Sequence, residues 1–88
     1  FAEAWGNLAL LYDRIGKISE ARKAFDKAYK LQPDLCNLAI NLGCFELNHG
    51  NPEAALRAIK AGLEYYPENP RLKELFEAAG KNRDENYN

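Results

Sequence analysis

Apolar side chains recur along this chain at intervals of three or four residues, the spacing that places them on one side of an α-helix. Stretches rich in Gly, Pro and Asn interrupt that spacing. The pattern predicts five helices, at about residues 3–15, 19–32, 35–49, 52–66 and 70–79. In the first helix, the apolar positions expected to be buried are Ala4, Trp5, Leu8, Leu11, Tyr12 and Ile15.

Turn residues mark the ends of these helices. Gly16 and Gly50 follow the first and third helices, where a left-handed backbone conformation costs glycine nothing. Asn-Pro pairs at 51–52 and 69–70 predict helix starts, because Asn is a favoured N-cap and Pro fits the first helical position. We therefore expect short turns between successive helices.

The same order of large, small and turn residues occurs twice, about 34 residues apart. The first copy carries Trp5, Leu8, Ala9, Tyr12, Gly16, Ala21, Phe25, Ala28 and Pro33, and the second carries Ala39, Leu42, Gly43, Glu46, Gly50, Ala55, Ile59, Gly62 and Pro67. A period of this length predicts stacked helix–turn–helix units, each of which needs a neighbour to cover its apolar face.

This pattern resembles the tetratricopeptide repeat family, with its W-x2-L-G-x2-Y, A-x3-F and closing Pro. The resemblance implies an all-α fold in which antiparallel helical hairpins stack as a right-handed α-solenoid of five helices. It places one domain at residues 1–80, followed by a flexible tail at 81–88. Within the domain we expect repeat 1 at about residues 2–35, repeat 2 at about 36–69 and a capping helix at about 70–80.

The last helix has the character of a cap. Lys73 and Gly80 stand where the earlier repeats carry Trp5 or Ala39 and Tyr12 or Glu46, so its outer side is polar. The chain also begins without Met and already in register with a repeat, and we expect it to be a piece of a longer protein.

Composition narrows the classes of function. The chain has 88 residues, a net charge of −1 and 28% charged residues, which argues against charge-driven binding to nucleic acid or anionic membranes. No stretch predicts a membrane span or a signal peptide. Cys36 and Cys44 lie about 12 Å apart along one predicted helix, too far for a disulfide, so we expect reduced thiols and a cytoplasmic setting.

The sequence offers little support for catalysis. His49 with the two cysteines has no metal-ligand spacing, and a histidine near a helix C-terminus is favoured there by the helix dipole. Glu46 and Glu53 have no partner at a fixed offset that would suggest acid–base chemistry. We expect no catalytic residue, cofactor or metal.

One face of the first helix of each repeat lies opposite the predicted buried stripe. It comprises Glu3, Asn7, Leu10 and Arg14 in the first repeat, Asn37, Asn41, Cys44 and Asn48 in the second, and Arg71, Leu75, Ala78 and Asn82 in the last helix. In the family that the chain resembles, this face lines a concave groove, and some members hold a peptide backbone with asparagines at the positions of Asn7 and Asn41. An amide suits this role because it both donates and accepts hydrogen bonds. The alternative is an ordinary solvated polar face.

A subgroup of the family clamps a C-terminal carboxylate from chaperones. Asn41 and Arg71 match that pattern, but Gly6 and Leu10 stand where it has Lys and Asn. The loss of a cation and an amide argues against chaperone-tail binding.

We therefore expect a non-enzymatic module that binds a peptide or helical segment of another protein in its groove, at Asn7, Asn41, Leu10, Arg14, Asn37, Cys44, Asn48 and Arg71. Two alternatives stay open. The chain could be a structural or oligomerisation element that self-associates through an uncapped first helix (Phe1, Ala4, Leu11), or it could be the scaffold arm of a larger enzyme.

Overall fold

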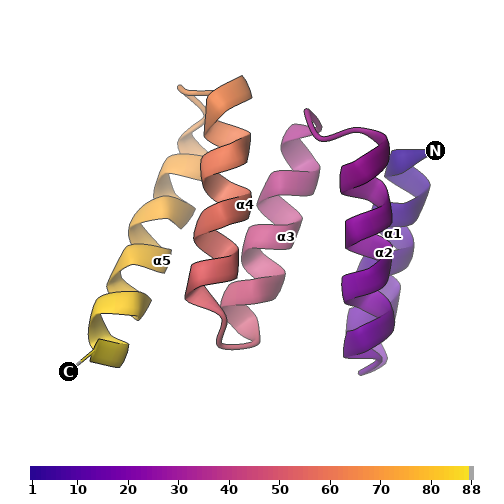
Figure 1. Cartoon of the computed structure of the whole chain (residues 1–88), viewed down its shortest axis with the longest axis horizontal. Coiled ribbons are helices and arrows are strands. Elements are labelled where there is room, and N and C mark those ends of the chain that lie inside the picture. The colour runs from indigo at the N-terminus through magenta and orange to yellow at the C-terminus, as the bar shows by residue number, and fades with distance from the viewer. Residues whose placement is uncertain (88) are drawn as a thin grey trace. The chain divides into compact units, whose positions relative to one another are not determined.

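The computed structural model describes residues 1–87, with side chains through residue 81, and within these residues the fold is entirely helical. The helices are α1 (Ala2–Arg14), α2 (Ile18–Leu31), α3 (Cys36–Asn48), α4 (Pro52–Tyr65) and α5 (Pro70–Tyr87) (Figure 1). The predicted all-α, five-helix fold is confirmed, and the first four helices have nearly the predicted bounds.

The fifth helix is longer than expected, since α5 continues to Tyr87 rather than ending near Ala79. Beyond Gly80 the chain loses its apolar periodicity, but it contains no further Gly or Pro, and its Lys, Arg and Glu residues are good helix formers. Loss of periodicity removes a packing face without breaking the helical backbone. The flexible tail at 81–88 stays a prediction, and the side chains at 82–88 lie outside the described residues.

By its internal contacts the chain divides into two compact units, Phe1–Leu38 and Ala39–Asn88, which we call unit 1 and unit 2. The first turn of α3 belongs to unit 1, and the rest of this helix belongs to unit 2. The division falls slightly after the boundary between repeats predicted near residue 35.

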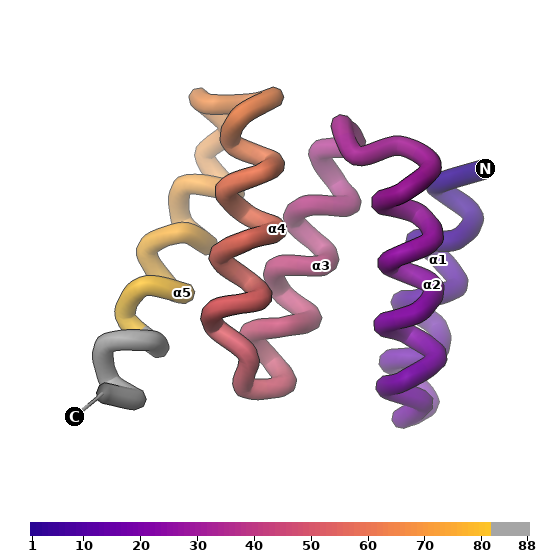
Figure 2. The backbone as a smooth tube through the Cα atoms, in the orientation of Figure 1, coloured from indigo at the N-terminus to yellow at the C-terminus, as the bar shows by residue number. Residues whose placement is uncertain are grey.

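The turns after α1 and α3, whose course the backbone tube of Figure 2 traces, have the same hydrogen-bond pattern. Gly16 and Gly50 have φ angles of 82° and 75°, as the sequence predicted. In the first turn, N–H of Gly16 donates to C=O of Asp13 at 3.0 Å, and N–H of Lys17 donates to C=O of Tyr12 at 2.8 Å. This pair of bonds is a Schellman motif, which satisfies carbonyls at the helix end.

In the core of unit 1, small residues allow α1 and α2 to approach each other closely. Phe25 is fully buried, and so are Ala9, Ala21 and Ala28. The expected burial of α1 is wrong in part: Ala4 is exposed, as are 51% of Leu11 and 58% of Ile15. The buried residues of α1 are Ala2 and Ala9, and the positions on the other sides of the helix are half-buried or exposed.

The core of unit 2 brings α3, α4 and α5 together around two glycines. A methyl group at Gly62 would lie 2.6 Å from Cβ of Ala39, and one at Gly43 would lie 2.8 Å from Cγ1 of Ile59. The α3 and α4 backbones therefore approach closely at these points. Of the α5 side chains, Leu72, Leu75 and Ala79 are buried in this core, whereas Phe76 is 40% exposed.

The two Asn-Pro starts behave differently. Asn69 caps α5, because its Oδ1 accepts a hydrogen bond of 3.0 Å from N–H of Leu72. Asn51 is the N-cap of α4, with Pro52 following, but its side chain makes no capping bond. Its Nδ2 instead donates to Oε1 of Glu46 at 3.3 Å.

That hydrogen bond explains how a carboxylate fits the position that Tyr12 holds in the first repeat. Glu46 is only 7% exposed and belongs to the turn after α3, where N–H of Asn51 also donates to its carbonyl at 2.8 Å. Schellman turns commonly have an apolar contact between the residues at these two positions. In the second repeat a polar contact takes its place.

Candidate peptide-binding faces

The predicted binding residues of α1 form one exposed face, which we call the α1 face. Its members are Glu3, Asn7, Leu10 and Arg14. All four are exposed, because spacings of three and four residues place them together on the side of α1 away from the buried Ala9. Leu10 is 38% exposed, so the face offers an apolar contact between polar groups.

A second face follows α3, and we call it the α3 face. Its members are Asn37, Asn41, Cys44 and Asn48. Asn37 and Asn48 are exposed and the other two are half-buried, so this is the least buried side of a helix whose remaining sides are mostly covered. Two apolar residues of the same helix, Ile40 and Leu47, are half-buried. Asn37 belongs to unit 1 and the other three members to unit 2.

In unit 2 the structure brings Arg71 of α5 to the α3 face. Its Nη2 donates to Sγ of Cys44 at 3.7 Å, and its Nη1 lies 3.5 Å from Oε2 of Glu74. The Arg71 and Glu74 side chains are 54% and 70% exposed, so their ion pair is weak and leaves the guanidinium open to another acceptor. Sequence reasoning missed Glu74, although its spacing of three residues from Arg71 on one helix is a known signal for such a pair.

The predicted continuation of the face along α5 is wrong at Leu75. This side chain is 5% exposed, and its Cδ1 lies 3.9 Å from the place a methyl group at Gly43 would take. Ala78 is exposed, and the Asn82 side chain lies outside the described residues. Of the predicted α5 positions, Arg71 is therefore the one that contributes a polar group to the face.

The chemistry of the two faces suits a neutral peptide backbone better than an anion. The amides of Asn7 and Asn41 can each donate to a carbonyl and accept from an N–H. Beside them, Gly6 and Leu10 offer neither a cation nor an amide for an anion. The charge on Arg71 is shared with Glu74.

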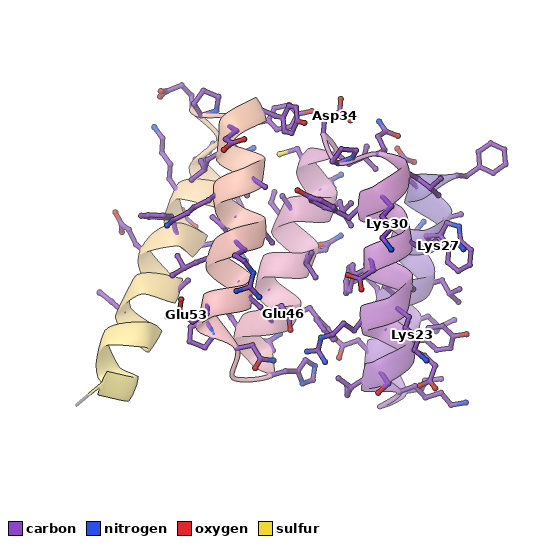
Figure 3. All side chains as sticks on the ribbon, in the orientation of Figure 1. Lys23, Lys27, Lys30, Asp34, Glu46 and Glu53 are labelled. Atoms are coloured by element: carbon purple, nitrogen blue, oxygen red, sulfur yellow. The ribbon has the colours of Figure 1, made fainter. Side chains whose placement is uncertain are left out.

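The remaining polar groups form local contacts. Lys23, Lys27 and Lys30 project from the outer side of α2 (Figure 3), and Nζ of Lys27 lies 5.5 Å from the centre of the Trp5 ring. A cation over an aromatic ring at this distance is attracted to it, so Lys27 also ties α2 to α1.

On α5, Nζ of Lys73 lies 2.9 Å from Oε2 of Glu68, and the hydrogen bond and then the charge of Lys73 lower the pKa of the Glu68 carboxyl. This pair lies on exposed surface.

Other candidate chemistry stays structural. Cys36 and Cys44 are not joined in a disulfide, as predicted. The ring of His49 lies 4.6 Å from that of Phe45, a packing contact at the end of α3. Among the residues that the structure describes, no three His, Cys, Asp or Glu side chains gather as a metal site would require. None of the described helices has the length and apolar character needed to cross a membrane.

A comparison with protein families matches part of the chain. The tetratricopeptide repeat family matches residues 2–35, which contain the hairpin of α1 and α2 and the break that follows it. A search of curated proteins finds none that matches the chain. The match to this repeat and the five-helix, all-helical fold fit a protein of the tetratricopeptide repeat family.

Proposed function

We propose that the chain is a non-catalytic module that binds an extended segment of another protein through the α1 face and the α3 face. Tetratricopeptide repeats generally mediate interactions between proteins, and the proposal adds which surfaces of this chain do so. The observation that carries it is the α3 face: three asparagines and a cysteine occupy the least buried side of α3, with Arg71 bonded to one edge.

The half-buried position of Asn41 matters for this proposal. A side chain that neighbours hold in place loses less conformational entropy when it binds than a fully exposed one does. Asn41 can therefore offer its amide to a peptide N–H or C=O at a small cost in ordering. Arg71 adds a donor, directed to a side-chain or backbone carbonyl of the peptide.

The test begins with a phage-displayed library of extended peptides, selected on the full chain. Binding of an enriched peptide is then measured by calorimetry for Asn7→Ala, Asn41→Ala and the double variant. Loss of one hydrogen bond costs about 0.5–1.5 kcal/mol, so each single variant should bind roughly 2- to 13-fold more weakly. Because these side chains lie outside the buried core, the melting temperature should stay nearly constant.

Gln32→Ala is the matched control, since it removes an exposed amide outside both faces. It should leave the affinity unchanged. Failure to enrich any peptide, or equal affinity of the enriched peptide for the wild-type chain and the double variant, would refute the proposal.

A further inference from the structure

The ion pair between Arg71 and Glu74 leaves hydrogen-bonding groups unused at the edge of the α3 face. Nη1 of Arg71 lies 3.5 Å from Oε2 of Glu74, and Nη2 of Arg71 donates to Sγ of Cys44 at 3.7 Å. A guanidinium has five N–H donors, so these two contacts leave others open. Among the side chains that the structure describes, none donates a hydrogen bond to Oε1 of Glu74. The pair therefore presents a free donor beside a free acceptor.

The contact with Cys44 places this pair next to Asn41. Cys44 and Asn41 are three residues apart on α3, which is about 4.5 Å along the helix axis. Arg71 and Glu74 are likewise three residues apart on α5 and lie on neighbouring sides of it. All four residues belong to unit 2. A peptide whose backbone meets Asn41 therefore brings its adjacent side chains to the charged pair.

The pair favours neither an acidic nor a basic side chain. A carboxylate is attracted by Arg71 and repelled by Glu74, and for an ammonium group the two effects are reversed. Either charge also loses part of its hydration when it binds. The four members of the α3 face carry no formal charge that would change this balance.

A primary amide satisfies both members of the pair at once. The side chain of Asn or Gln carries a carbonyl oxygen and an NH₂ group on one carbon. Its oxygen accepts from an N–H of Arg71 while its nitrogen donates to Oε1 of Glu74. A trans peptide unit directs its C=O and N–H to opposite sides, so the backbone of the ligand does not make both bonds together.

We propose that Arg71 and Glu74 form a subsite for a primary amide, so that the bound peptide carries Gln or Asn at this position. The inference rests on the proposed function, because it assigns a preferred side chain to a peptide whose backbone Asn41 holds. Each hydrogen bond lost should weaken binding by roughly 2- to 13-fold.

The test starts from a peptide enriched in the phage selection on the full chain. Each position of that peptide in turn carries Gln, Glu, Lys or Leu, and the affinity of every peptide is measured by calorimetry. At one position the wild-type chain should bind Gln more tightly than Leu by roughly 2- to 13-fold. Glu and Lys at that position should both bind less tightly than Gln.

Charge-removing variants assign the preference to the pair. In Glu74→Gln the preference at that position should move from Gln to Glu, and in Arg71→Gln it should move to Lys. Each shift should be roughly 2- to 5-fold, the range of exposed ion pairs. Glu68→Gln is the matched control, since it neutralises the carboxyl of the other ion pair on α5, with Lys73, and should leave every preference unchanged. Circular dichroism of each variant verifies that the helices are intact.

The results separate this inference from the function on which it rests. Peptides that lose affinity in Asn41→Ala but prefer Gln at no position overturn the subsite and leave the proposed function standing. A preference for Gln that is unchanged in both Arg71→Gln and Glu74→Gln also overturns the subsite. Failure to enrich any peptide refutes the proposed function and the subsite together.

Discussion

Gly62→Ala tests how closely α3 and α4 pack in unit 2. The added methyl would lie 2.6 Å from Cβ of Ala39, and 3.2 Å and 3.3 Å from the two terminal carbons of Leu72. Carbon atoms pack best at about 3.5–4.0 Å, so the two helices would have to separate locally by about 1 Å. Both Cβ atoms are fixed to the backbone, and therefore no change of rotamer relieves the contact.

The expected loss of stability is the difference between two effects. Overpacking of a well-filled core costs about 1–3 kcal/mol, and a contact this short between rigid atoms belongs at the upper end. Replacing Gly by Ala inside a helix returns about 1 kcal/mol. The net change is a loss of about 2 kcal/mol, which lowers the melting temperature of a domain of this size by roughly 8–16 °C.

Thermal unfolding followed by far-UV circular dichroism measures this change, and two further variants make the reading specific. Gly80→Ala adds a methyl to α5 where nothing lies within 4 Å, so it should stabilise the protein by about 1 kcal/mol. The double variant Ala39→Gly/Gly62→Ala moves one methyl from α3 to α4. It should recover most of the stability that Gly62→Ala loses.

The reasoning fails if Gly62→Ala is as stable as the wild-type chain while Gly80→Ala behaves as expected. That result would mean that α3 and α4 have room at this point. An equal loss of stability in Gly62→Ala and in the double variant would show that Cβ of Ala39 is not the atom that opposes the added methyl.

Three further changes test other parts of the fold. Gly50→Ala, at a φ angle of 75° in open space, should destabilise the chain by about 1–2 kcal/mol in urea denaturation, because the backbone strain alone opposes it. Asn69→Ala should cost about 1 kcal/mol in the same assay, since N–H of Leu72 loses its capping acceptor; no change would argue against the cap. Lys73→Gln should raise the pKa of Glu68 toward its ordinary value in an NMR titration, because the hydrogen bond and charge that lower that pKa are gone. The small stabilisation that this pair adds at neutral pH is lost as the pH falls through the lowered pKa, so stability should differ between the two proteins at neutral pH and converge in acid.

Local signals predicted the helices and turns well because each depends on a few neighbouring residues. Gly16 was expected to stop α1 from its position alone, and the structure places it at a left-handed φ. The extent of α5 could not be predicted in this way. Apolar periodicity reports packing against a neighbour, and a helix that runs past its packing partner no longer shows it.

Burial was harder to predict, since it depends on which surfaces have neighbours. Leu11 and Ile15 fit a buried helical pattern, yet both are more than half exposed. Leu75 was expected on an open face, yet it lies in the core beside Gly43. A helical wheel gives the direction of a side chain but does not say what lies there.

The candidate binding site was predicted as a set of positions, and the structure adds contacts within each unit. The four members of the α3 face share one side of the helix because their spacing is helical. The bond between Arg71 and Cys44 joins residues 27 positions apart in the chain, and no local pattern reports such a pair. To predict this bond, one must know how α5 packs against α3 in addition to knowing that α5 forms.

The chain has a single tryptophan, Trp5, and it lies in unit 1 under the side chain of Lys27. Tryptophan emission, excited at a wavelength that tyrosine does not absorb, therefore follows the melting of unit 1, whereas circular dichroism sums the helices of both units. Recording the two signals on one sample shows directly whether the units lose their structure as a single cooperative block or in succession, without the introduction of any label.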